Sequence, residues 1–162
     1  MSKADQLAAA LDEFLGVSPD VEAAAVVSAD GLPMASALPP YVEEDRLAAM
    51  SAALLTLGER AAEGLGKGEL AQVFVEGEQG YVVLMSAGPS AVLVTVTSQS
   101  AKAGLVLFEM RKTAAAIESI MDQKAAVPEP ATPAAPEPGP AHPWEAEPGQ
   151  ESTDAESSVS GW

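Results

Sequence analysis

The segments YVVLMS, residues 81–86, and AVLVTVT, residues 91–97, decide the fold of this chain. In both segments apolar residues occupy both alternating sets of positions, so neither predicted strand has a fully polar face. Strands with this pattern are buried on both sides. The sequence therefore predicts a sheet with helices packed against both of its faces.

A third strand precedes these two, at residues 70–76 (LAQVFVE). The connections at 77–80 and 87–90 are too short for a parallel crossover, which needs a dozen or more residues. The three strands are therefore predicted to form an antiparallel meander.

Two further strands are predicted upstream, at residues 21–28 (VEAAAVVS) and 32–38 (LPMASAL). Asp30 and Gly31 lie between them, and this pair indicates a hairpin because both residues tolerate a positive φ. Pro33 has no backbone N–H to donate to a neighbouring strand. The strand at 32–38 is therefore expected at an edge of the sheet.

Apolar residues recur every three or four positions in three other segments, which predicts helices at 3–15, 43–65 and 101–124. The second of these is rich in Ala beside a stripe of Leu and Met, so another helix could approach it closely. The predicted order is α-β-β-α-β-β-β-α, an α+β domain with a five-stranded antiparallel sheet.

The composition changes at Ala125, after which the chain has eight prolines, seven acidic residues and no Lys or Arg. Such a segment buries too little apolar surface to offset the entropy of ordering. We therefore expect a folded domain at 1–124 and a disordered, acidic, Pro-rich tail at 125–162. Its Pro-x-x-Pro spacings could form a ligand for a Pro-recognising domain, but a solubilising linker is favoured.

The formal net charge of −16 disfavours nucleic acids and anionic membrane surfaces as partners. There are no cysteines, which excludes disulfides and thiol chemistry. No apolar run reaches the roughly 18 residues of a membrane span, and the first residues do not resemble a secretion signal. We expect a cytoplasmic protein without direct membrane insertion.

The sequence predicts no catalytic residue, metal site or cofactor. The single histidine, His142, lies among the prolines of the tail. The segment GLGKG at 64–68 lacks the spacing and the strand-to-helix order of a phosphate-binding loop, so it is interpreted as a helix stop. Arg60 and Arg111 could act as arginine fingers, but both lie inside predicted helices, and solvated helix surfaces are favoured. We expect a protein that is not an enzyme.

Three blocks together resemble the roadblock/LC7 family: AAAVVSADGLPMAS at 23–36, MSAALLTLGERAAEGL at 50–65 and AKAGLVLFEMRKTAAAIESI at 101–120. Their order and spacing are most similar to the prokaryotic MglB-like branch. The resemblance implies a longin/profilin-like fold with strand order 2-1-5-4-3. It places the second helix on one face of the sheet and the first and third helices on the other.

The resemblance also implies a function: a non-enzymatic homodimer that binds and regulates a small Ras-like GTPase, for example as its GTPase-activating partner. The alternative is a structural scaffold of a motor or signalling complex that leaves nucleotide hydrolysis unchanged. Family members dimerise through the second helix and the third strand. Mapped onto this chain, the implied dimer and partner interface consists of Leu47, Met50, Ser51, Leu54, Leu57, Gly58, Ala61, Val73, Phe74 and Val75.

Overall fold

The computed structural model describes residues 1–123, and the tail expected at 125–162 lies outside the described residues. The elements in chain order are α1 (Lys3–Val17), β1 (Val21–Ser28), β2 (Pro33–Ala37), α2 (Glu44–Gly64), β3 (Gln72–Gly77), β4 (Gly80–Ser86), β5 (Ala91–Thr97) and α3 (Ala103–Asp122). This order confirms the predicted α+β class, and every predicted helix and strand is present.

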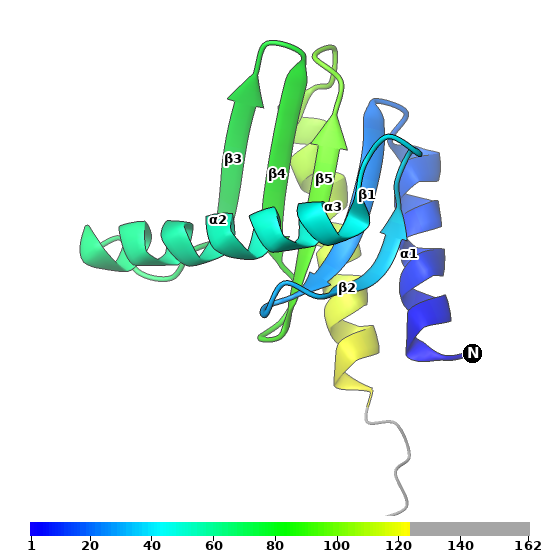
Figure 1. Ribbon diagram of the computed structural model, residues 1–162, viewed down its shortest axis with the longest axis horizontal. Coiled ribbons are helices and arrows are strands. Elements are labelled where there is room, and N and C mark those ends of the chain that lie inside the picture. Colours follow the sequence, from blue (N-terminus) through cyan, green and yellow to red (C-terminus); the bar gives the residue numbers. More distant parts are fainter. Residues whose placement is uncertain (124–162) are drawn as a thin grey trace, which may run out of the picture. The chain divides into compact units, whose positions relative to one another are not determined.

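The five strands form one antiparallel sheet with the order β2-β1-β5-β4-β3. Figure 1 shows β5 in the centre, with β2 and β3 at the two edges. The order that the family resemblance implied is confirmed. Pro33 begins the edge strand β2, next to an irregularity in its pairing with β1, and so needs no donor to a further strand.

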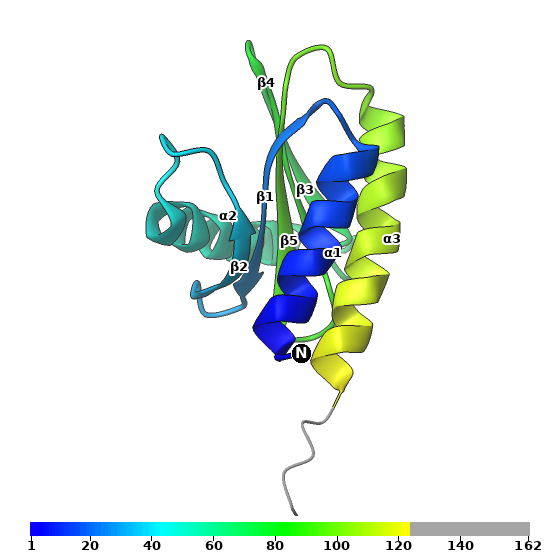
Figure 2. The same ribbon diagram turned by 90° about the vertical axis from the view of Figure 1, so that its right-hand side faces the viewer.

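The core has two layers because the central strands are apolar on both faces. On one face, α1 and α3 pack against the sheet through Leu7, Leu11, Phe14, Met110 and Ile117. On the other face, α2 packs through Leu47, Ala48 and Leu55. Figure 2 shows the sheet edge-on between these two helical layers. The prediction of helices on both faces is confirmed.

The helix boundaries differ slightly from those predicted. α1 continues two residues past its predicted end, through Gly16 to Val17. α2 ends where predicted, with Gly66 at a φ of +70°. The Lys67 N–H donates to the Ala62 carbonyl and the Gly66 N–H donates to the Glu63 carbonyl. This pair of bonds is a Schellman motif, which satisfies the last carbonyls of the helix.

Among residues 1–123, no helix is both long enough and apolar enough to cross a membrane.

Gly80, at the start of β4, cannot be replaced without strain. Its φ is +146°, and a Cβ atom there would collide with the Thr97 carbonyl oxygen of β5. We expect Gly80→Ala to lower the free energy of unfolding by about 2–4 kcal/mol, from backbone strain and overpacking together. Urea unfolding at a fixed protein concentration measures this loss.

The matched control is Gly16→Ala, because a Cβ at that helical position meets no atom within 4 Å. This change should stabilise the protein by up to about 1 kcal/mol through a lower entropy of the unfolded chain. Equal effects of the two substitutions would contradict the packing of Gly80 against β5.

Candidate dimer and partner interface

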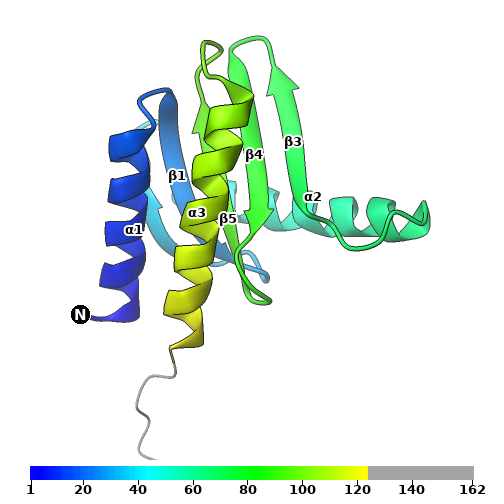
Figure 3. The same ribbon diagram turned by 180° about the vertical axis from the view of Figure 1, so that it is seen from behind.

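α2 is too long for the sheet that it crosses. Its 21 residues make a helix about 32 Å long, whereas five strands span about 19 Å between their outer axes. The helix begins over β1 and β2, so the excess length falls at the β3 end. Figures 1 and 3 both show the C-terminal part of α2 extending past β3. This part is termed the overhang and comprises residues 59–64.

Gly58 is the point where α2 leaves the sheet. A Cβ atom at this position would lie 2.8 Å from Val73 Cγ2 and 3.0 Å from Leu70 Cδ2. The missing side chain therefore lets the helix approach β3 closely. Beyond Gly58 the support ends, since every residue of the overhang except Ala62 is exposed.

The helical period divides α2 into a face toward the sheet and two flanks. Leu47, Ser51 and Leu55 face the sheet and are buried, and the Ser51 hydroxyl donates to the Leu47 carbonyl at 2.7 Å. One flank is apolar along its length; it is termed the apolar flank and consists of Met50, Leu54, Leu57 and Ala61. The opposite flank carries Glu59 and Glu63. Leu57 exposes 61% of its surface, so the apolar flank is open to a partner.

β3 is an edge strand with apolar side chains on both faces. Phe74 stacks on Tyr81 at a centroid distance of 4.9 Å and remains 40% exposed. Val75 points to the α2 face and is 41% exposed. Exposed apolar edge strands favour pairing with another chain, and monomeric proteins usually protect them with charges or proline.

α2 also leaves part of its own sheet face uncovered. A groove of about 380 Å³ lies on that face, next to the β3–β4 turn. Val75, Val82 and Val96 line it from three adjacent strands, and Glu22 lines it from β1. This row of three valines is termed the apolar strip, and it lies on the same face of the sheet as α2.

The residues implied by the resemblance therefore fall into three groups. Met50, Leu54, Leu57 and Ala61 share the apolar flank. Leu47 and Ser51 are buried under α2 within the chain, and Gly58 meets Val73 there. Phe74 and Val75 lie on opposite faces of the exposed edge. The sequence did not indicate Val82 and Val96 as interface residues, because it does not reveal which part of the sheet face α2 leaves open.

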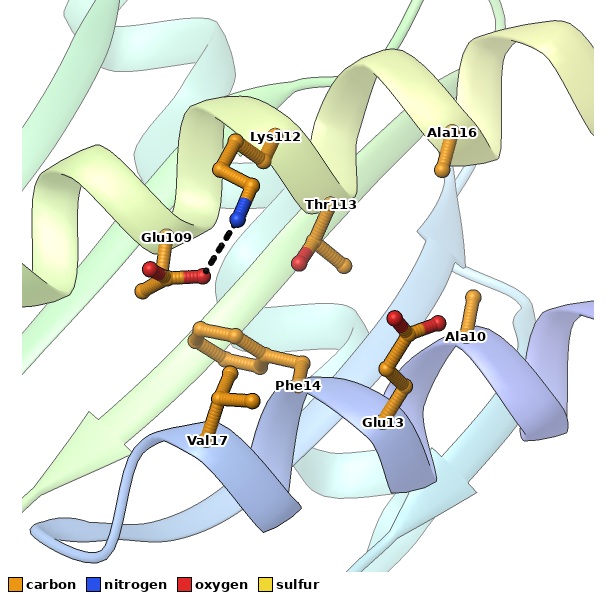
Figure 4. A pocket seen from close by; sticks show the side chains of 8 residues that line it. All are labelled: Ala10, Glu13, Phe14, Val17, Glu109, Lys112, Thr113 and Ala116. Carbon is orange, nitrogen blue, oxygen red and sulfur yellow. Dashed lines mark hydrogen bonds and ion pairs between the residues drawn. The ribbon is translucent and has the colours of Figure 1, made fainter.

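A second surface cleft lies between α1 and α3 and has a volume of about 150 Å³. Figure 4 shows Phe14 and Val17 from α1 facing Glu109 and Lys112 from α3. Lys112 Nζ lies 3.4 Å from a Glu109 carboxylate oxygen, so these two side chains form an ion pair within α3. Within residues 1–123 no group of three His, Cys, Asp or Glu side chains could hold a metal ion.

Residues 4–97 match the sequence model of the Roadblock/LC7 domain. This chain belongs to the Roadblock/LC7 family. Two uncharacterised proteins of Methanocaldococcus jannaschii are each 33% identical to it over 106 residues, which cover 65% of this chain and 92% of each relative. The suspected family membership is thereby confirmed.

Solved structures show the same Roadblock/LC7 fold. The gliding protein MglB from Thermus thermophilus matches with a TM-score of 0.69 at 20% identity, over 76% of this chain and 94% of that chain. Myxococcus xanthus MglB matches with a TM-score of 0.69 at 20% identity, over 75% and 91%. A Roadblock/LC7 domain from Streptomyces avermitilis matches with a TM-score of 0.52 at 29% identity, over 70% and 97%.

The contact at Gly58 gives a direct test of how α2 is attached in this Roadblock/LC7 domain. Gly58→Leu should lower the free energy of unfolding by about 1–3 kcal/mol, because the new side chain forces α2 away from Val73 and Leu70. Urea unfolding followed by circular dichroism, at one fixed protein concentration, measures the change.

Ala53→Leu is the control, since Ala53 is exposed on α2. A surface substitution of this kind should change the stability by less than about 0.5 kcal/mol. If Gly58→Leu were as mild as Ala53→Leu, α2 would not rest on β3 as described.

Proposed function

We propose that this Roadblock/LC7 protein is a non-enzymatic homodimeric adaptor that binds and regulates a small Ras-like GTPase. The observation that carries the proposal is the overhang of α2, which continues the apolar flank past an exposed apolar edge strand. Leu57 lies on that flank just before the overhang, and most of its surface is not covered by any other part of residues 1–123. Burial of such a side chain contributes about 1.5–3 kcal/mol, which favours a partner at this position.

The proposed partner at this surface is a second copy of the chain. A two-fold axis beside β3 joins the two edge strands into one continuous sheet and places the overhang of each protomer above the sheet of the other. The apolar strip of Val75, Val82 and Val96 is the part of that sheet that its own α2 leaves open. In such an isologous contact each protomer supplies both surfaces.

The GTPase partner is what the resemblance to MglB-like members implies, and the match to MglB structures in fold supports it. In the proposed dimer the two α2 helices lie side by side on one face of the joined sheet and form the platform for the GTPase. The Gly-rich segment ends α2 through the turn at Gly66 and is not proposed as a nucleotide site.

Leu57→Glu should disrupt the dimer, because it places an unpaired charge in the proposed helix contact. Such buried charges cost several kcal/mol, so the variant should sediment as a monomer at concentrations where the natural protein is a dimer. The fold should persist, since Leu57 contributes little to the core of its own protomer.

The matched control is Leu105→Glu. Leu105 has the same exposed fraction, 61%, but lies on α3 at the other face of the sheet. This variant should sediment like the natural protein. Equal behaviour of the two variants would reject α2 as the dimer contact.

The partner is tested by mixing the purified dimer with the small Ras-like GTPase encoded nearest to it. We expect a complex in gel filtration and a changed rate of phosphate release, and both effects should be lost with Leu57→Glu. A complex without a change in rate would support the scaffold function. Neither a complex nor a rate change would reject a role with that GTPase.

A further inference from the structure

A groove of about 370 Å³ lies beneath the flank of α2 that is opposite the apolar flank. It is termed the acidic groove. Its lining comes from α2, the loop before β3, the end of β4 and the turn after it, the start of β5, and Ala29 just after β1.

The floor of the acidic groove is apolar. Leu55, Ala91 and Val92 are buried beneath it, and Leu70 and Pro89 lie at its sides. Seven of its eleven lining residues are apolar or glycine. An occupant therefore gains apolar contact as well as charge contact.

The rim carries three carboxylates, on Glu59, Glu63 and Glu69, and the lining contains no Lys or Arg. Within residues 1–123 the ion pair that forms is Glu109–Lys112 in α3, so none of these three carboxylates pairs with a described cationic side chain within 4.0 Å.

The negative charges of Glu59 and Glu63 lower the stability of α2 for two reasons. Glu59 and Glu63 are four residues apart, and like charges at this spacing destabilise a helix by about 0.2–0.5 kcal/mol. Glu63 also lies in the last turn of α2, at the negative end of the helix dipole, where cations are preferred. A cationic occupant relieves both effects.

We propose that the acidic groove is a docking site for a short basic segment of a partner protein, with lysine or arginine side chains against the glutamates and an apolar side chain on the floor. The spacing suits an extended segment. Alternate residues of a strand are about 6.6 Å apart, close to the 5–6 Å between Cβ atoms four apart on a helix. Two cations of an extended Lys-apolar-Lys sequence therefore reach Glu59 and Glu63 together.

Docking of a basic segment in the acidic groove is an interaction in addition to the proposed dimer and its GTPase partner. The groove lies on the flank of α2 that faces away from Met50, Leu54, Leu57 and Ala61, so two-fold pairing through that apolar flank leaves it open. A dimer would carry two such grooves. Loss of the dimer and loss of this site are separable, because they are changed by different substitutions.

The experiment titrates the full ¹⁵N-labelled chain with the peptide acetyl-Lys-Leu-Lys-Leu-Lys-amide and follows the amide shifts by NMR. We expect saturable shifts at Glu59, Glu63, Glu69, Gly88 and Ala91. Glu59→Gln with Glu63→Gln should weaken binding about fivefold to tenfold, from the loss of two partly exposed ion pairs. Sedimentation of this variant should still show the oligomeric state of the natural protein.

The matched control is Asp12→Asn with Glu13→Gln, which removes two exposed charges from α1 on the other side of the sheet. It should leave the affinity within about twofold, because screening makes distant exposed charges weak. A control peptide with Ser in place of Leu should bind more weakly. A second control peptide with Glu in place of Lys should not bind.

Three results would overturn the proposal. The first is the absence of saturable shifts at the groove. The second is shifts spread over all acidic surfaces, which would mean attraction by net charge alone. The third is an equal loss of affinity in the α1 control variant.

Discussion

The contact of Gly58 with Val73 and Leu70 is the constraint on which the arrangement of α2 depends. The absence of a side chain at Gly58 lets the helix lie close to β3 at this point, because a Cβ there would force Val73 or Leu70 to shift. Up to this point α2 is part of the core. Beyond it, the helix continues through residues 59–64 without support. In the proposed dimer, this exposed part is the element that contacts the second copy.

The division of three helices between two faces explains the rest of the surface. α1 and α3 run alongside each other and cover one face of the sheet (Figure 3). α2 alone covers the other face, and it crosses the strands. It therefore leaves part of that sheet face uncovered, and its C-terminal end extends past the edge strand β3. The apolar strip and the exposure of the apolar flank of α2 follow from this one geometry. The acidic groove lies beneath the other flank, between α2, the segment before β3 and the turn between β4 and β5.

Much of the fold could be predicted from local pattern. Apolar residues occupy both alternating sets of positions at 81–86 and 91–97, which predicted a sheet covered on both sides. Pro33 predicted the edge strand of that sheet. The candidate site could be predicted only in part. Periodicity identified the stripe of Met50, Leu54 and Leu57, but it could not show that Leu47 and Ser51 turn toward the sheet. The angle at which α2 crosses the strands is set by tertiary packing, so neither Val82 nor the acidic groove could be found from sequence.

A cysteine scan tests the proposed assembly most directly, because the chain has no native cysteine. Single cysteines are placed in turn along β3 at 72–77 and along the opposite edge strand β2 at 33–37, and each variant is oxidised at low concentration. Pairing of β3 with its two-fold copy predicts a covalent dimer that peaks at one or two neighbouring β3 positions, with little from β2. An absence of covalent dimer along β3, or an equal yield along β2, would contradict a dimer built on β3 and α2.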